Sequence, residues 1–415
     1  MLKNLSQSLL LLAAFITSVP AAPSPYPGKW GKGHLHPEGA RAIYFITNDA
    51  SNSVAAVPVA SNGLLSEGSL TPTGGEGGNS ISGATNQPAA PDALISQSSV
   101  TIAGNRGQNI FAVNAGSNTL SMLSIDPQDP TKLTLIGAPA SLPGQFPNTV
   151  AASANNQLVC VGTTGVTNGV SCSSFSQKGL GAMDSLRSFD LVQTTPPVGP
   201  TNTVSQLFFS EDESHLFATV KGNPAINTTG FFSVFPVEGG NWRVKPSLST
   251  VDTRSSPAGT AVLFGSENIP GTSNVFVTDA SFGGAVVSVD AISGTASTVA
   301  KQVIAGQIAT CWATISPVTG TAFVADVGVN RLVEMSLSDA SIVSILDLSA
   351  NGDPGLVDLE AAGNFIYALS PGNGTTPAAV TVLDVSGGPG SAKQVQHFQL
   401  AAMGVDKNAQ GMAVF

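Results

Sequence analysis

Charged residues are scarce in this sequence. They make up 10% of its 415 residues, and only 16 residues are lysine or arginine. These basic residues are scattered along the chain, and the formal net charge is -10. Binding to nucleic acid or to an anionic membrane surface depends on clustered basic side chains. We therefore expect neither nucleic acid nor a membrane as a partner.

Long apolar runs are also missing beyond the N-terminus, where Gly, Asn, Pro or Asp interrupts every β-rich stretch before it could span a bilayer. The N-terminus itself has Lys3, a short apolar run at residues 9–16 and small residues up to Ala21. This pattern is typical of a signal peptide. We predict that residues 1–21 are a signal peptide, that residues 22–41 are an N-terminal extension, and that the mature protein is secreted, either free or attached to the cell wall.

The sequence has only three cysteines. Cys160 and Cys172 flank a stretch rich in glycine and threonine that reads as a hairpin, and export permits a disulfide. We predict that these two cysteines pair. Cys311 lies in the apolar run IATCWATIS with no histidine near it in sequence, so we expect a buried free thiol.

Two asparagines outside the predicted signal peptide begin glycosylation sequons. Asn227 starts the triplet Asn-Thr-Thr, and Asn373 starts Asn-Gly-Thr. Both triplets lie in polar stretches typical of turns, and the chain is expected to be exported. We therefore predict a glycan on each.

The residues that are abundant favour an all-β fold. Glycine and proline number 45 and 27, and the apolar stretches are rich in Val, Ala, Ser, Thr and Phe. One phrase recurs roughly every 40 to 70 residues: an apolar strand with aromatic residues, a polar turn and a second alternating strand. Seven instances predict a seven-bladed β-propeller over residues 42–415, and they begin at Ala42, Asn109, Gln157, His215, Asn274, Thr321 and Asn364.

A further short strand precedes most of these phrases, and we interpret it as the innermost strand of each blade. The segments are NTVAAS, SQLFFS, GTAVLF, CWATIS and VDLEAA. The phrase at Ala42 has none, whereas QGMAVF at the C-terminus has the pattern but no blade of its own. We predict that this C-terminal strand completes the first blade and closes the ring. Two separate β-domains would leave both the even repetition and this last strand unexplained.

The phrases FAVNAGSNTLSMLSI at Phe111, SQLFFSEDESHLFATVKG and FVADVGVNRLVEMSL at Phe323 resemble the lactonase-like propeller family. That family includes 6-phosphogluconolactonase-like proteins and the fungal 3-carboxymuconate cyclases. The phrase YFITNDASNSVAAVPVASNGLLS looks like the secreted fungal branch, which consists of exported cyclase-like glycoproteins. The resemblance extends from Ala42 to Phe415, and it implies the propeller fold and a lactonase or cyclase ancestry.

The sequence departs from the family where the family's chemistry is expected. Intracellular members typically begin one inner strand with Pro-Arg-His, but the corresponding strand here begins Pro147-Asn148-Thr149. The equivalent points of the other inner strands carry no basic residue: they are Gln206, Trp312, Asp358 and Gly411. Cycloisomerisation of a tricarboxylate needs cations for the carboxylates and a general acid. That set cannot be assembled from these residues.

The candidate catalytic residues that remain are Gln206, His215, Asp358 and Glu360, as acid, base and polar groups. Glu211, Asp358 and Glu360 lie on or beside predicted inner strands. Hard cations prefer such oxygen ligands, so binding of a divalent cation such as Ca²⁺ or Mg²⁺ is a hypothesis. Otherwise we expect no cofactor, because the sequence has no phosphate loop, zinc spacing or nucleophile elbow. Asp279 and Asp326 are expected to accept backbone N–H bonds in turns.

Two hypotheses about function follow. In the first, the protein is a secreted glycoprotein that has lost the ancestral active site and uses the propeller as a binding or adhesion platform for a small molecule, a glycan or a host-surface ligand. In the second, it is an extracellular isomerase or lactonase that acts on a small cyclic ester or carboxylated substrate in the central funnel. We expect a monomer in either case. The enzyme hypothesis predicts titratable groups that converge in an open funnel, whereas the platform hypothesis predicts a funnel that is plugged or neutral.

Overall fold

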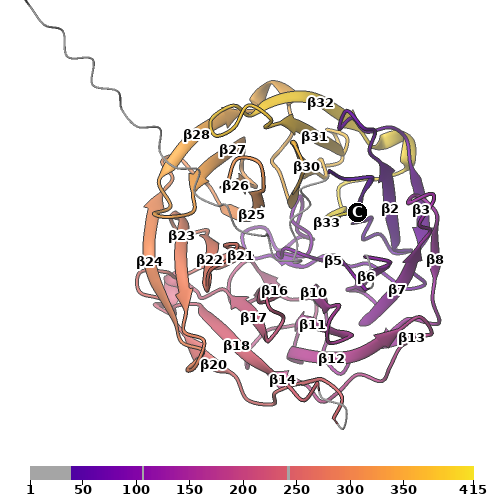
Figure 1. Cartoon of the computed structure of the whole chain (residues 1–415), viewed down its shortest axis with the longest axis vertical. Coiled ribbons are helices and arrows are strands. Elements are labelled where there is room, and N and C mark those ends of the chain that lie inside the picture. Colours follow the sequence, from indigo (N-terminus) through magenta and orange to yellow (C-terminus); the bar gives the residue numbers. More distant parts are fainter. Residues whose placement is uncertain (1–38, 105–106, 241–243) are drawn as a thin grey trace, which may run out of the picture.

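The structure is a computed structural model that describes residues 39–104, 107–240 and 244–415. Seven β-sheets are arranged around a central axis, and each runs from the centre to the rim (Figure 1). Helical structure in the described residues is limited to three single turns, η1 (Pro224–Ile226), η2 (Ser349–Asn351) and η3 (Ala401–Met403). The predicted all-β, seven-bladed propeller is confirmed. The predicted signal peptide lies outside the described residues.

Three blades are plain four-stranded antiparallel sheets. Their strands follow chain order from the centre outwards, because each polar turn returns the chain beside the strand that precedes it. From inside to outside they are β21 (Leu263–Asn268), β22 (Asn274–Asp279), β23 (Gly283–Val289) and β24 (Ala296–Val303); β25 (Thr310–Ser316), β26 (Thr321–Asp326), β27 (Val329–Ser336) and β28 (Ile342–Asp347); and β29 (Leu359–Ala362), β30 (Phe365–Ser370), β31 (Ala379–Asp384) and β32 (Lys393–Gln399).

Three further blades have an outermost strand that is split into two short pieces, both paired with the third strand. These blades contain β5 (Val100–Ala103), β6 (Asn109–Asn114), β7 (Thr119–Ile125), β8 (Leu133–Leu135) and β9 (Ala140–Ser141); β10 (Pro147–Ser153), β11 (Leu158–Thr164), β12 (Asn168–Ser176), β13 (Gly179–Leu180) and β14 (Arg187–Ser188); and β16 (Val204–Phe209), β17 (His215–Val220), β18 (Phe231–Glu238), β19 (Ser247–Leu248) and β20 (Thr253–Ser255).

The remaining blade joins the two ends of the described chain. Its order from the centre is β33 (Gln410–Val414), β1 (Ala42–Ile46), β2 (Ser53–Pro58) and β3 (Ser69–Pro72). Strand β33 is antiparallel to β1 and therefore supplies the inner strand. The predicted closure of the ring by the C-terminal strand is confirmed.

One predicted inner strand is misplaced. The segment GTAVLF, residues 259–264, was expected to be a strand, but β21 begins only at Leu263. The carboxylate of Asp279 accepts hydrogen bonds from the backbone N–H groups of Ala261 (2.7 Å) and Val262 (3.0 Å). These two residues are thereby held in a turn outside the sheet ladder. The expected turn-tying role of Asp279 accounts for the shift, and Asp326 accepts bonds from Ile308 and Ala309 in the same way in the next blade.

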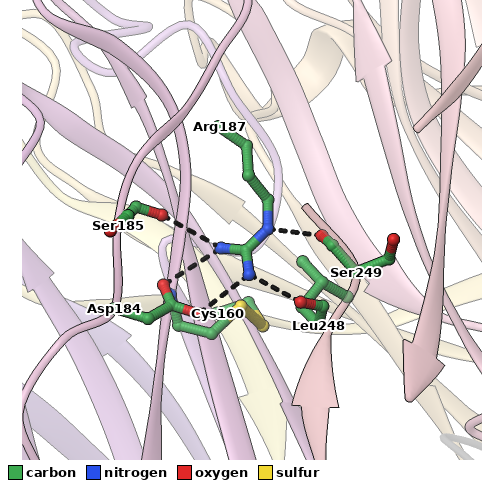
Figure 2. Close-up of a disulfide and its surroundings, with 7 residues drawn as sticks. Cys160, Asp184, Ser185, Arg187, Leu248 and Ser249 are labelled. Atoms are coloured by element: carbon green, nitrogen blue, oxygen red, sulfur yellow. Dashed lines mark hydrogen bonds and ion pairs between the residues drawn. A yellow bond between two sulfur atoms is a disulfide. The ribbon is translucent and has the colours of Figure 1, made fainter. Parts of the chain in front are cut away.

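The predicted disulfide joins neighbouring strands of one blade. Cys160 on β11 lies opposite Cys172 on β12, and their sulfurs are bonded. Figure 2 shows the buried Arg187 beside this bond. Its guanidinium donates to Asp184 and, in the adjacent blade, to the carbonyl oxygens of Leu248 and Ser249. The disulfide is confirmed, and Arg187 connects its blade to the next one.

An insertion departs from the regular blade pattern. Between β3 and β5 the chain leaves the rim and enters the centre of the ring, where Figure 1 shows it as the purple segment next to β5. We call residues 79–99 the channel insertion. Its first part contains β4 (Ile81–Ser82), which pairs in parallel with β15 (Val198–Gly199). The insertion lies in the longest interval of the repeat, and it determines what the centre of the propeller can do.

Candidate functional site

The central channel is filled by the second half of the channel insertion. Residues 93–97 are buried. The side-chain amide of Gln97 donates to the carbonyl oxygen of Ala313 at 2.9 Å and accepts from the Ala313 N–H at 3.1 Å. The backbone N–H of Gln97 donates to Ser205 O at 2.9 Å. Gln97 therefore connects two inner strands, β25 and β16, through the centre of the channel.

Asn148, at the start of the inner strand β10, binds this insertion. The fully buried Asn148 on β10 donates from Nδ2 to Leu94 O at 3.3 Å and to Val204 O at 2.7 Å. In return the hydroxyl of Ser96 donates to Asn148 O at 2.6 Å. The Asn148 amide thus serves to hold the insertion in place.

Gln206 and Trp312, at equivalent positions of two other inner strands, also form hydrogen bonds to the insertion. Gln206 on β16 donates from Nε2 to the hydroxyl of Ser98 at 3.3 Å, and its Oε1 accepts from Ser266 N. Trp312 on β25 is fully buried and donates from its indole nitrogen to Ser96 O at 3.0 Å. Both side chains therefore form hydrogen bonds to the insertion within the channel.

The remaining two equivalent positions, Asp358 and Gly411, are also in contact with the insertion. Asp358, immediately before β29, accepts from the backbone N–H of Ser98 at 3.2 Å and of Leu359 at 3.0 Å. At Gly411 on β33 the backbone has φ of +82°, and a Cβ there would overlap the hydroxyl of Ser99. Glycine is therefore needed at this close approach. Asn148, Gln206, Trp312, Asp358 and Gly411 are thus all in contact with the channel insertion.

Beyond Gln97 the channel retains a small cavity of about 60 Å³. Gln206, Glu267 and Glu360 are among its lining residues. For comparison, a cavity of roughly 150 Å³ holds one benzene molecule. The space is therefore suited to a few water molecules and excludes a sugar lactone or carboxymuconate.

Burial favours the neutral form of the carboxyl groups in and near this cavity. Burial raises the pKa of Glu267 to about 8 and that of Asp358 to about 7. Burial, together with the two neighbouring acids, raises the pKa of Glu360 well above its usual range. Within the described residues no three His, Cys, Asp or Glu side chains form a group that could hold a metal ion.

Two further titratable residues lie near Ile95 of the insertion: Lys221, which follows β17, and Asp92, which belongs to the insertion itself. Lys221 is 2% exposed and donates to Ile95 O at 2.8 Å and to the Ser205 hydroxyl at 2.9 Å. Its ammonium also lies 4.2 Å from the centre of the Phe264 ring. Burial lowers the pKa of Lys221 to about 7 and raises that of Asp92 to about 7.

The structure therefore brings three of the four candidate catalytic residues together, namely Gln206, Asp358 and Glu360. His215 lies apart: its Nδ1 is 2.8 Å from the Ser214 hydroxyl, its ring stacks on Phe217, and it lines a surface groove. Glu211 is also outside the channel, where it accepts from Gly271 N.

The sequence analysis missed three charged residues of the channel, Asp92, Lys221 and Glu267. Glu267 would have been found if β21 had been placed correctly, because it then lies on an inner strand like Glu360. No local pattern indicates the other two, since Asp92 lies in the insertion and Lys221 follows an ordinary blade strand.

Comparison with solved structures finds lactonase-like propellers. The periplasmic gluconolactonase PpgL of Pseudomonas aeruginosa is 14% identical, with a TM-score of 0.61 over 89% of this chain and 98% of that one. A candidate 6-phosphogluconolactonase of Bacteroides fragilis is 10% identical, with a TM-score of 0.57 over 90% and 97%. The structural neighbours thus include 6-phosphogluconolactonase-like seven-bladed propellers. At these identities the likeness establishes the fold. No protein-family model matches the chain, and neither does any curated protein sequence.

The raised pKa values predict a pH dependence of stability. Because the folded protein keeps protons on Glu267 and Glu360 that the unfolded chain releases, the unfolding free energy is expected to fall as pH rises from about 5 to 7. Asp358 and Asp92 act in the same direction, whereas the lowered pKa of Lys221 opposes the fall above pH 7.

Denaturant unfolding at several pH values would measure this slope. Glu267→Gln mimics the neutral acid and should flatten the curve, by on the order of 1 kcal/mol for each unit of pKa shift removed. Glu211→Gln, on the surface, is the matched control and should not change the slope. A slope that is unaltered in Glu267→Gln would contradict the burial of a neutral carboxyl.

Proposed function

We propose that this protein is a secreted glycoprotein, located outside the cell or in the cell wall, whose lactonase-like propeller is a non-catalytic binding or adhesion platform. The observation that carries the proposal is the filled channel. Five positions that would form the ancestral site, namely Asn148, Gln206, Trp312, Asp358 and Gly411, are all used to hold the channel insertion.

The chemistry of the remaining cavity supports the same proposal. A cyclase or lactonase must admit its substrate and stabilise developing negative charge. Here the cavity is about 60 Å³, and burial raises the pKa of Glu267 and Glu360, which line it, so that their neutral forms are favoured. The buried Lys221 does not line this cavity, and its amine is hydrogen-bonded to Ile95 and Ser205.

The two sequons suggest which face binds a partner. Asn227 and Asn373 are exposed and lie in the β17–β18 and β30–β31 loops, which join the second and third strands of their blades. In a propeller such loops lie on one face of the ring. Glycans at both sites would crowd that face. We infer that a monomer binds a glycan or another host-surface ligand through its opposite face or its rim.

A second candidate function is catalysis in the channel. It is favoured by Gln206, Glu267 and Glu360 around one cavity, because strongly shifted carboxyl pKa values are common at active sites. The channel insertion would have to move for a cyclic ester or carboxylated substrate to enter. The channel contacts of Gln97 and Trp312 oppose such a movement.

Turnover assays distinguish the two functions. The secreted protein, with and without a chelator, would be incubated with glucono-δ-lactone and with carboxymuconate, while calorimetry tests binding of the same compounds. We expect no turnover above buffer and no saturable binding. Turnover that is lost in Glu360→Gln but kept in the matched control His215→Ala, which alters a side chain outside the channel, would overturn the platform proposal.

A further inference from the structure

A second cavity lies between the channel insertion and three neighbouring blades, those of β16, β21 and β25. It has a volume of about 220 Å³, and its floor is formed by the buried side chains of Ile95, Lys221, Phe264 and Cys311. The exposed Pro200 lies at its rim, so the cavity is accessible from solvent. It is larger than the roughly 150 Å³ that holds benzene.

The walls of this cavity are mainly apolar. Val262 and Phe264 come from the blade of β21, whereas Ala309, Cys311 and Val327 come from the blade of β25. Burial raises the pKa of the Cys311 thiol well above its usual value, which makes it a small apolar surface rather than a nucleophile. A ring-sized apolar body fits such walls.

One side of the cavity is polar and incompletely hydrogen-bonded. Ser80 is fully buried, lines the cavity, and its hydroxyl has no hydrogen-bond partner in the described part of the chain. The Ser80 N–H donates to Ala93 O at 2.8 Å, and both Ser80 and Asp92 line the cavity. Asp92 accepts from Ile95 N through Oδ1, and no described residue donates to its Oδ2.

Buried polar atoms are nearly always paired, so the unpaired Ser80 hydroxyl indicates a missing partner. One ligand hydroxyl would satisfy both groups, because it can accept from the Ser80 hydroxyl and donate to Asp92. We propose that this cavity binds a small, neutral, ring-sized apolar molecule that bears one hydroxyl group, such as a simple phenol. This site is separate from the small cavity beyond Gln97, and it does not depend on the proposed platform function.

Ligand-observed NMR titration of the full secreted protein tests the site, with p-cresol and toluene as probes. The two probes have the same methyl-substituted ring and differ only in the hydroxyl. We expect p-cresol to saturate one site and toluene to bind about tenfold more weakly. Ser80→Ala should weaken p-cresol about fivefold without affecting toluene, because it removes one hydrogen bond.

The chain offers a matched control in Ser99, which is also buried in the insertion and does not line the cavity. Its hydroxyl, like that of Ser80, has no hydrogen-bond partner among the described residues. Ser99→Ala should leave both affinities unchanged. Ala280→Phe, which places a ring in the cavity, should abolish binding of both probes. The proposal is overturned by an absence of saturable p-cresol binding, by equal affinity for toluene, or by insensitivity to Ser80→Ala.

Discussion

Replacing Trp312 with alanine is expected to lower the free energy of unfolding by about 3–5 kcal/mol. Trp312 is fully buried, packs edge-on against Phe264 with ring centres 5.0 Å apart, and donates to Ser96 O in the channel insertion. Its loss would leave a cavity at the centre of the ring and a carbonyl without its donor. Equilibrium unfolding in denaturant, followed by far-UV circular dichroism, measures the change.

Two variants separate the causes. Trp312→Phe retains an aromatic ring but loses the indole N–H, so about 1–3 kcal/mol of the loss should remain. Ile292→Ala removes a side chain that is 99% exposed and should change stability by less than about 0.5 kcal/mol. If Trp312→Ala were as mild as Ile292→Ala, the insertion would not be packed against the inner strands as described.

Removal of the disulfide is expected to cause the second large loss of stability. The double variant Cys160→Ala/Cys172→Ala is expected to lose about 3 kcal/mol of unfolding free energy. The bond closes a loop with a sequence separation of 12 between β11 and β12, and the unfolded chain gains conformational freedom without it. The same unfolding experiment, performed on the oxidised protein, gives the reference value.

Cys311→Ala provides the control for this prediction. Cys311 is a buried thiol outside any disulfide, so its replacement removes buried volume but no cross-link. It should therefore cost less than the double variant, and added reductant should not lower its stability any more than it lowers that of the unaltered protein. Equal stability of the oxidised protein and the double variant would show that the cross-link contributes nothing.

The blades could be predicted from the sequence because each one is a local unit. An apolar strand, a polar turn and a second strand pair within a short stretch of chain, so the phrases beginning at Asn109 and Asn274 coincide with the starts of β6 and β22. The closure could be predicted as well, since the segment at Gln410 had a strand pattern with no neighbour of its own.

The filling of the channel could not be predicted, because it depends on contacts between residues far apart in sequence. Residues 79–99 contain polar residues and prolines without a β period, which is the pattern of a surface loop. Only the folded ring brings Gln97 to Ala313 and Ser98 to Asp358. Asp358 was singled out as a channel residue, but its bond to the insertion has no signal in the local sequence.

Hydrogen exchange of the channel insertion tests the central claim most directly. In the filled channel, the N–H groups of Gln97 and Ser98 are bonded to Ser205 and Asp358, whereas residues 83–88 of the same insertion are exposed. Mass spectrometry of peptides covering 93–99 and 83–88 compares the two parts. The account predicts that 93–99 exchanges as slowly as the inner strand β25, with 83–88 exchanging rapidly. Equally rapid exchange in both would contradict it and leave the channel open to a substrate.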